Sequence, residues 1–134
     1  MKAFLSIKFW GDDRNRGHVE AVIRAIEDSG FDVFCIRRDA EKWGEIKFTP
    51  EGLMNTTFAE IDRSHVLVAD VADWPIGVGV EAGYAFAKGI PVICICQEGK
   101  PMANTVAGFA SSVIKYNDYD ELKSRLVLLS RKLK

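Results

Sequence analysis

Residues 65–96 constrain the fold more than any other part of the sequence. They begin with a short run of mostly apolar residues, 66–69, which is typical of a strand buried on both faces. A polar turn follows, then the glycine-rich stretch 77–83, which leads into a helical pattern that ends at Gly89. A second apolar run, 90–96, comes next. The segment therefore predicts a strand, a crossover helix and a second, parallel strand.

The predicted helix has one apolar face and an unexpected number of glycines. Its apolar residues recur at helical spacing at Val78, Ala82, Ala85 and Phe86. Glycine inside a helix costs about 1 kcal/mol relative to alanine, so Gly83 needs a reason. Either the glycines let the helix pack closely on the sheet, or they let a ligand approach the backbone. The residues alone leave both interpretations open.

Two carboxylates are expected at the carboxyl ends of the strands, the edge of the sheet where open α/β folds bind ligands. Asp70 ends the first strand of this unit, and Glu81 is expected in or near the first turn of the helix. The helix dipole and free amides there favour an ionised carboxylate. An ionised carboxylate can act as a nucleophile. The structural alternative is that Asp70 caps a turn and Glu81 is a solvated helix charge.

The rest of the chain repeats the alternation of strand and helix. Strands are expected at 3–9, 31–36 and 111–116, and helices at 18–29, 51–63, 102–110 and 118 to about 132. Thr49 is expected to cap the helix that follows it. The pattern predicts a single α/β domain over residues 1–134, flavodoxin-like or Rossmann-like, with helices on both faces of a parallel sheet. The sheet should have about five strands in the order 2-1-3-4-5.

Composition narrows the classes of partner. The net charge of −1 provides no global basic field, so no nucleic-acid partner is expected. No apolar run reaches the length of a membrane span, so no membrane association is expected. The three cysteines lie in apolar runs and are expected to be reduced core residues, which favours a cytoplasmic location. His18 and His65 lack metal-ligand spacing and are expected at a helix start and a strand entry.

The ordered motif of residues 69–71, 77–85 and 89–93 resembles the nucleoside 2-deoxyribosyltransferase family, including its 2′-deoxynucleoside 5′-phosphate N-hydrolase branch. The resemblance implies that Glu81 attacks the anomeric carbon of a nucleoside or nucleotide, while Asp70 assists at the base and sugar. It thus implies cleavage or transfer at an N-glycosidic bond through a covalent glycosyl-glutamate, with no cofactor and no metal. It also implies a homodimer or higher homo-oligomer.

The resemblance further assigns substrate contacts to the first strand and the loop after it. Phe4 takes the position of a family tyrosine, and Arg14 and Arg16 lie in the loop. Phenylalanine lacks the tyrosine hydroxyl, so weaker selectivity for deoxyribose is expected. The segment 37–50 is long enough to be a lid, and either Trp43 or Phe48 could stack on a base or pack beneath its own loop.

The same resemblance bears on a 5′-phosphate. Gly77 and Gly79 could offer backbone amides to a ligand at the helix start. The hydroxyls that the N-hydrolase branch uses for phosphate fall here on Pro75 and near Ala103, which have none. Nucleosides are therefore expected to react at least as well as their 5′-monophosphates. Asn104 lies in the segment that relatives extend into a neighbouring subunit, although it could instead cap the short helix.

Two other functions fit a glutamate in such a crevice. One is a TIR-like NAD glycohydrolase, which also cleaves an N-glycosidic bond. The other is a non-catalytic nucleotide-binding module on the same scaffold, because a fold does not establish chemistry. Consumption of NAD without cleavage of nucleosides would favour the first, and tight binding without product would favour the second.

Overall fold

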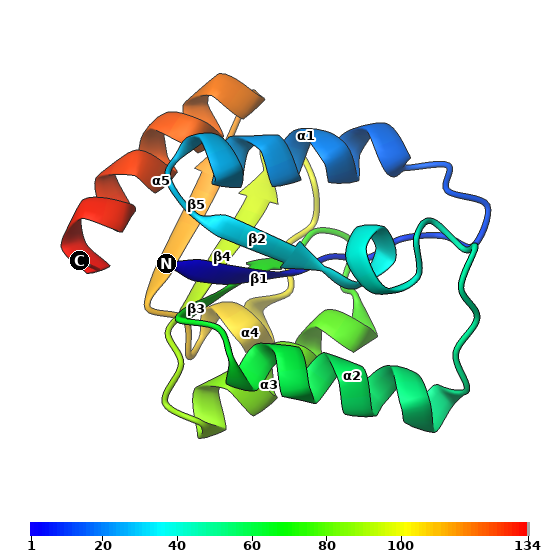
Figure 1. Cartoon of the computed structure of the whole chain (residues 1–134). Helices are drawn as coiled ribbons and strands as arrows, with labels where there is room; N and C mark the ends of the chain where they lie inside the picture. The colour runs from blue at the N-terminus through cyan, green and yellow to red at the C-terminus, as the bar shows by residue number, and fades with distance from the viewer. Residues whose placement is uncertain (134) are drawn as a thin grey trace.

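The computed structural model describes residues 1–133, which form a parallel sheet between two layers of helices (Figure 1). The strands are β1 (Lys2–Ser6), β2 (Asp32–Cys35), β3 (Val66–Asp70), β4 (Val92–Gln97) and β5 (Ser112–Tyr116). The helices are α1 (Arg16–Asp28), α2 (Pro50–Asp62), α3 (Ile76–Ala87), α4 (Asn104–Ala107) and α5 (Tyr119–Leu133), with a short π-helix, η1 (Ile36–Ala40).

The sheet has the predicted topology. Its five strands are all parallel and lie in the order β2-β1-β3-β4-β5. Helices α1 and α5 cover one face, and α2, α3 and α4 cover the other (Figure 1). The strand order reverses between β1 and β3, and in such sheets the ligand crevice lies at the carboxyl ends of the strands at this point. The topology alone therefore predicts a ligand site at the carboxyl ends of β1 and β3.

Two apolar clusters hold the layers together. Leu5 and Val68 belong to the cluster beneath α1 and α5, whereas Phe4 and Leu67 belong to the cluster beneath α2, α3 and α4. All four side chains are almost fully buried, as expected for central strands of a parallel sheet. Consecutive strand residues therefore face alternate helical layers, and this alternation decides where polar residues at the strand ends point.

The main differences from the predicted elements lie at the end of β1 and at the start of α3. β1 ends at Ser6 rather than near residue 9, because the chain leaves the sheet there to form the loop before α1. α3 begins at Ile76, so Gly77 and Gly79 lie within the helix and not in the preceding turn. Thr49 caps α2 as predicted, since its hydroxyl accepts the Gly52 N–H at 3.0 Å.

The structure of α3 differs from the prediction at Phe86 and bears on the role of its glycines. Val78, Ala82 and Ala85 are buried as predicted, but Phe86 is 58% exposed and lies against Phe109. A Cβ atom added at any of the three helix glycines, Gly77, Gly79 and Gly83, would meet no atom within 4 Å. Packing of α3 on the sheet therefore does not explain these glycines, and Gly79 and Gly83 lie on the same open face as Phe86.

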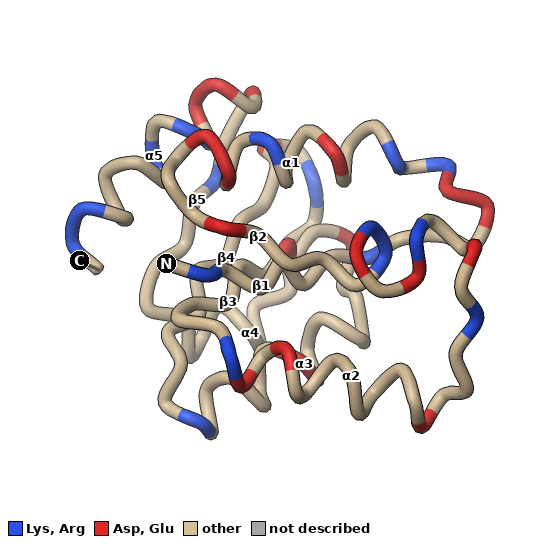
Figure 2. Tube along the Cα trace, in the orientation of Figure 1, with Lys and Arg blue, Asp and Glu red and all other residues tan. Residues whose placement is uncertain are grey.

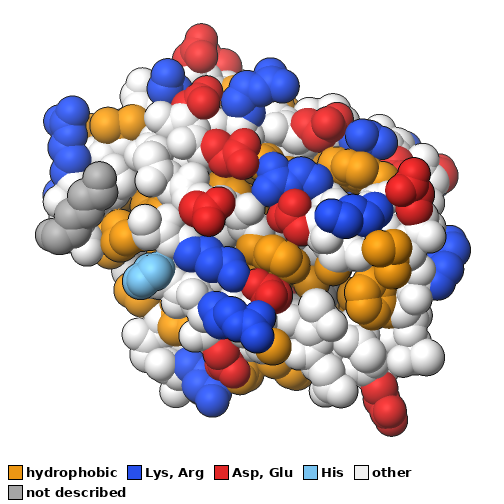
Figure 3. Space-filling view, in the orientation of Figure 1, with side chains coloured by type: hydrophobic (Ala, Val, Ile, Leu, Met, Phe, Trp, Pro, Cys, Tyr) orange, Lys and Arg blue, Asp and Glu red, His pale blue; other side chains and the backbone are white. Residues whose placement is uncertain are grey.

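The surface carries charges of both signs. Acidic and basic residues crowd together along the loop between β1 and α1 and around η1 (Figure 2), and they alternate over the face seen in Figure 3. Within residues 1–133, none of the helices has both the length and the apolar character needed to span a bilayer. The three cysteines are buried and unbridged, as predicted.

Candidate active site

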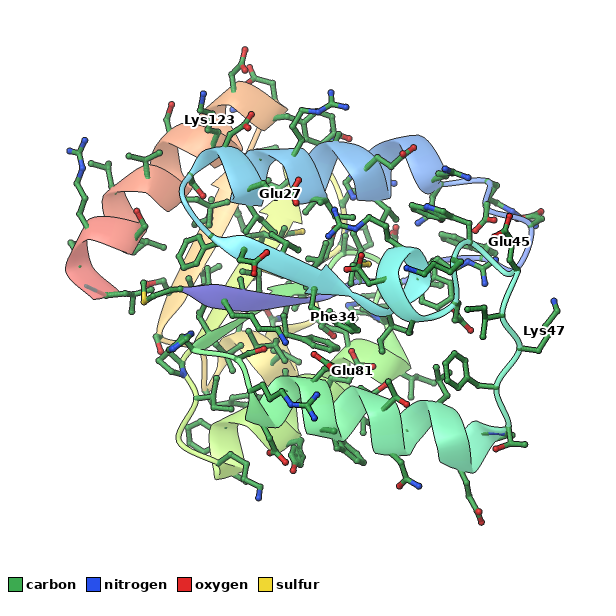
Figure 4. The ribbon with its side chains drawn as sticks, viewed as in Figure 1. Glu27, Phe34, Glu45, Lys47, Glu81 and Lys123 are labelled. Atoms are coloured by element: carbon green, nitrogen blue, oxygen red, sulfur yellow. The ribbon has the colours of Figure 1, made fainter. Side chains whose placement is uncertain are left out.

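Glu81 lies between the sheet and α2, in the second turn of α3 (Figure 4). The hydroxyl of Ser6 donates a hydrogen bond to its Oε1 at 2.6 Å. Burial raises the pKa of Glu81 to about 7, and the Ser6 hydrogen bond opposes this rise. The expectation of a first-turn carboxylate kept ionised by the helix end is therefore wrong. At neutral pH the side chain is instead divided between its two protonation states.

Ser6 takes the place that the sequence assigned to Phe4. Phe4 is fully buried, and its ring stacks on Phe34 with centroids 6.0 Å apart, so it is a core residue and not a substrate contact. Ser6 lies on the same face of β1, two residues closer to the carboxyl end where ligands bind. Since a hydroxyl does reach Glu81, the argument for weaker deoxyribose selectivity no longer holds. The strand alternation alone could have pointed to Ser6.

Asp70 ends β3 on the opposite face of the sheet. Its Oδ1 accepts the Ala72 N–H at 3.1 Å, so Asp70 does stabilise the turn that follows it. Its Oδ2 lies 3.0 Å from Nε2 of His18, and Nδ1 of His18 lies 2.7 Å from the hydroxyl of Tyr119. His18 lies in the first turn of α1, near the helix start as predicted, but its ring is not a free surface group and joins Asp70 in a polar cluster that sequence reasoning missed.

A cavity of about 320 Å³ opens beside Asp70 and His18. Its size is that of sites that enclose small organic ligands. Trp10, for whose ring no role was predicted, forms part of its wall, and Arg14 lines it as expected. The complete lining is Ile7, Lys8, Trp10, Arg14, Asn15, His18, Asp70, Ala72, Asp73, Gln97 and Lys100. We call this space the Asp70 cavity.

A second cavity of about 70 Å³, the Glu81 cavity, lies beneath the sheet. Its lining comes from the end of β1 and the residues after it, from the junction of β2 and η1, and from α2, with Glu81 itself: Leu5, Ile7, Phe9, Cys35, Ile36, Leu53, Met54, Thr57 and Glu81. Ile7 lines both cavities, so they adjoin at this side chain. The structure thus brings the two carboxylates to the same edge of the sheet but into neighbouring cavities on opposite faces.

The two arginines of the first loop have different surroundings. Arg14 pairs with Asp12 at 2.9 Å and lies over the ring of Trp10, at the wall of the Asp70 cavity. Arg16 lies 4.1 Å from the ring centre of Trp43 and lines neither cavity, so its predicted substrate contact is not supported. Trp43 packs against the core, which favours the structural interpretation of that residue.

The first loop is held in place by a buried arginine from η1. The guanidinium of Arg37 donates to Asp13 at 2.8 Å, to the carbonyl of Gly11 at 3.2 Å and to Glu41 at 3.3 Å. Arg37 is 6% exposed, and its carboxylate partners raise its pKa further. These contacts fix the segment that carries Trp10 and Arg14 at the wall of the Asp70 cavity.

A third, more open cavity of about 590 Å³ lies between the start of α3 and α4. Gly79 and Asn104 line it, whereas Gly77 does not. Asn104 is the first residue of α4, whose N-cap is Ala103 without a side-chain cap bond, so the capping alternative for Asn104 is wrong. No charged side chain is among the described residues that line this cavity, which we call the α3–α4 cavity.

The fold and these residues define a doubly wound α/β domain with carboxylates at the switch point of its sheet, the usual position of an enzyme crevice in this class. A family model described as nucleoside 2-deoxyribosyltransferase matches residues 5–121. The chain belongs to this family. It is therefore an enzyme, and its chemistry is cleavage or transfer at the N-glycosidic bond of a nucleoside or nucleotide.

Individual relatives agree with this assignment. A Thermofilum pendens protein whose name describes a 2′-deoxynucleoside 5′-phosphate N-hydrolase is 25% identical over 133 residues, 94% of this chain and 92% of the relative. A Clostridium botulinum CMP N-glycosidase has the same fold, with a TM-score of 0.70 at 19% identity over 96% and 99% of the two chains. So does a 2-deoxyribosyltransferase from Bacillus psychrosaccharolyticus, with a TM-score of 0.73 at 18% identity over 94% and 96%.

Proposed function

We propose that the protein cleaves the N-glycosidic bond of nucleosides with Glu81 as the nucleophile. The carboxylate attacks C1′, so that a C1′–O bond forms while the C1′–N bond breaks and its electron pair leaves with the base. The departed base takes up a proton from solvent. Water then attacks C1′ and gives a proton back to solvent while the C1′–O bond to Glu81 breaks, which releases the sugar and restores the carboxylate; alternatively, a second base takes the place of water. The observation that carries this proposal is the partly buried Glu81, which holds a hydrogen bond from Ser6 and has a pKa near neutrality.

The two adjoining cavities suggest how the substrate lies. The Asp70 cavity, at about 320 Å³, has room for a base, and Trp10 offers a ring on its wall. The Glu81 cavity, at about 70 Å³, is too small for a nucleoside, so the sugar would approach Glu81 from the Asp70 cavity across Ile7. Asp70 would then contact the leaving base while Glu81 reaches C1′ from the other side of Ile7.

Among the residues that the structure describes, the cavity at the start of α3 lacks charged side chains that could bind a 5′-phosphate. The α3–α4 cavity, where the helix start of α3 offers free amides, has no charged side chain among its described lining residues. The basic residues Lys8, Arg14 and Lys100 line the Asp70 cavity instead. We therefore retain the expectation that nucleosides react at least as well as their monophosphates, although the name of the T. pendens relative describes a phosphorylated substrate.

The exposed face of α3 supports association of two copies. Ile76 is 87% exposed, Val80 50% and Phe86 58%, and Trp74 just before the helix is 66% exposed. Large apolar side chains gathered in this way mark interaction surfaces. Since the glycines of α3 leave open space on the helix, a partner helix could approach closely. The face also adjoins the α3–α4 cavity, where Asn104 lies.

The decisive experiment replaces Glu81 with alanine and measures base release from nucleosides by chromatography. Glu81→Ala should keep the fold and abolish release. Glu45→Gln changes an exposed glutamate on the loop before α2 and should keep full activity. Rapid quenching of the wild type followed by mass spectrometry should detect protein that has gained the mass of the sugar. Release at the wild-type rate by Glu81→Ala would exclude Glu81 as the nucleophile.

A further inference from the structure

The polar cluster at the end of β3 includes a histidine for which the proposed reaction has no role so far. His18 from α1 contacts Asp70 of β3 through one ring nitrogen and Tyr119 of α5 through the other, at 3.0 and 2.7 Å. Three separate elements therefore meet at one imidazole. His18 also lines the Asp70 cavity, so the cluster faces the space assigned to the base.

The partners of His18 define which nitrogen carries its proton. A carboxylate only accepts hydrogen bonds, so Nε2 carries the hydrogen and donates to Asp70. In the neutral ring Nδ1 is then an acceptor, and the hydroxyl of Tyr119 donates to it. The other oxygen of Asp70 accepts the N–H of Ala72 at 3.1 Å. Two donors thus hold the carboxylate of Asp70, one on each oxygen.

The burial of the cluster helps to hold the Asp70 carboxylate in one orientation. The side chain of Asp70 is 6% exposed and that of His18 is 27% exposed. Burial, followed by the nearby charge of Asp70, raises the pKa of Tyr119, which keeps its hydroxyl protonated and able to donate. A carboxylate held from two sides in a buried position keeps one orientation toward the cavity, as a preorganised catalytic group requires.

We propose that His18 is a positioning residue for Asp70 in the reaction at the N-glycosidic bond, an inference that rests on the proposed function. Its Nε2–H holds Oδ2 of Asp70, while Tyr119 fixes the plane and tautomer of the imidazole. Asp70 then accepts a hydrogen bond from an N–H group of the base and holds the base in one orientation as the bond to C1′ breaks. His18 acts through Asp70, and the proposal includes no proton transfer by His18.

Kinetics of three variants test this proposal. His18→Ala removes the donor to Asp70 and should lower kcat by roughly tenfold to a hundredfold, the effect of one hydrogen bond to a charged group, with a smaller change in KM. His18→Gln places an amide N–H near the position of Nε2 and should recover most of the lost kcat. Tyr119→Phe leaves the donor but frees the ring, so its loss of kcat should be smaller than that of His18→Ala.

The matched control is His65→Gln. His65 lies before β3, where its Nδ1 accepts the Lys2 N–H at 2.9 Å, far along the strand from the carboxyl end, and this variant should keep the wild-type kcat. Nitrogen NMR of the imidazoles gives a readout without turnover. It should show the Nε2–H tautomer for His18 in the wild type, and the signal of Nδ1 should shift in Tyr119→Phe, where that nitrogen loses its hydrogen-bond donor.

The outcomes separate this inference from the function on which it rests. Wild-type kcat in His18→Ala, with Glu81→Ala inactive, would overturn the role of His18 and leave the nucleophile in place. Equal losses in His18→Ala and His18→Gln, or an Nδ1–H tautomer in the wild type, would also overturn it. A wild-type protein that releases no base from any nucleoside would refute the proposed function together with this inference.

Discussion

Removal of the Ser6 hydroxyl should shift the pH at which the enzyme works. Ser6 donates to Oε1 of Glu81 at 2.6 Å and counteracts the effect of burial on the pKa of that carboxyl, which is about 7. A hydrogen bond to a charged group contributes about 1.5–3 kcal/mol, and one pKa unit corresponds to about 1.4 kcal/mol. In Ser6→Ala the pKa of Glu81 should therefore rise by about one to two units, to about 8–9.

The consequence at neutral pH follows from the ionised fraction of Glu81. At pH 7 about half of the wild-type molecules carry the nucleophilic carboxylate, against about 1–10% in Ser6→Ala. The value of kcat/KM at pH 7 should fall roughly 5- to 50-fold and should return toward the wild-type plateau at about pH 10. The sign is fixed because only the ionised form attacks, so kcat/KM rises with pH in both proteins.

The assay is a pH profile of kcat/KM for one nucleoside, which reports the pKa of the free enzyme. Ser130→Ala is the matched control, since Ser130 is also buried but donates to the carbonyl of Val127 within α5. Its profile should coincide with that of the wild type. A Ser6→Ala profile that is lowered by the same factor at every pH, with an unchanged midpoint, would show that Ser6 places Glu81 rather than tuning its ionisation.

Three further predictions concern stability, substrate and assembly. Because burial raises the pKa of Glu81 from 4.5 to about 7, ionisation of this side chain costs the folded state up to about 3 kcal/mol above pH 7. Glu81→Gln removes this cost, so it should raise the free energy of unfolding measured in urea at pH 8 and should hardly change it at pH 4. At fixed salt, kcat/KM for a deoxynucleoside should equal or exceed that for its 5′-monophosphate; a large preference for the monophosphate that disappears in Arg14→Ala would contradict this and identify the phosphate ligand. Light scattering at micromolar concentration should show a dimer that Val80→Asp dissociates, whereas Leu128→Asp, which alters another exposed apolar residue, should leave it intact; a monomeric wild type would count against the dimer.

The fold could be predicted because its determinants are repeated along the chain. Buried apolar runs alternate with helical patterns, and a parallel sheet with right-handed crossovers leaves few strand orders. The position of the site followed from the same rule, since Asp70 ends β3, a strand at the switch point, and Glu81 lies in the helix that follows it. The direction of each side chain was harder to predict. A shift of two residues along β1 separates the buried Phe4 from Ser6, which reaches Glu81.

The other features that the sequence did not predict depend on contacts between distant parts of the chain or on burial. His18 is 52 residues from Asp70 and 101 from Tyr119, so no local pattern relates them. The pKa of Glu81 depends on how much water the sheet and α2 exclude, and periodicity does not measure that. Phe86 was misplaced because α3 is apolar on most of its surface, so the spacing of apolar residues could not separate its buried face from its open one.

The division of the crevice by the sheet has a consequence for how such an enzyme can diversify. The wall of the Asp70 cavity comes largely from the loop after β1 and the ends of β3 and β4, whereas the surroundings of Glu81 come from β1, β2 and α2. The two linings share only Ile7, so substitutions in the loop after β1 leave the other side chains around Glu81 unchanged. A descendant could therefore change its preferred base through loop mutations while its nucleophile stays untouched, and selection could act on recognition and on bond cleavage in separate steps.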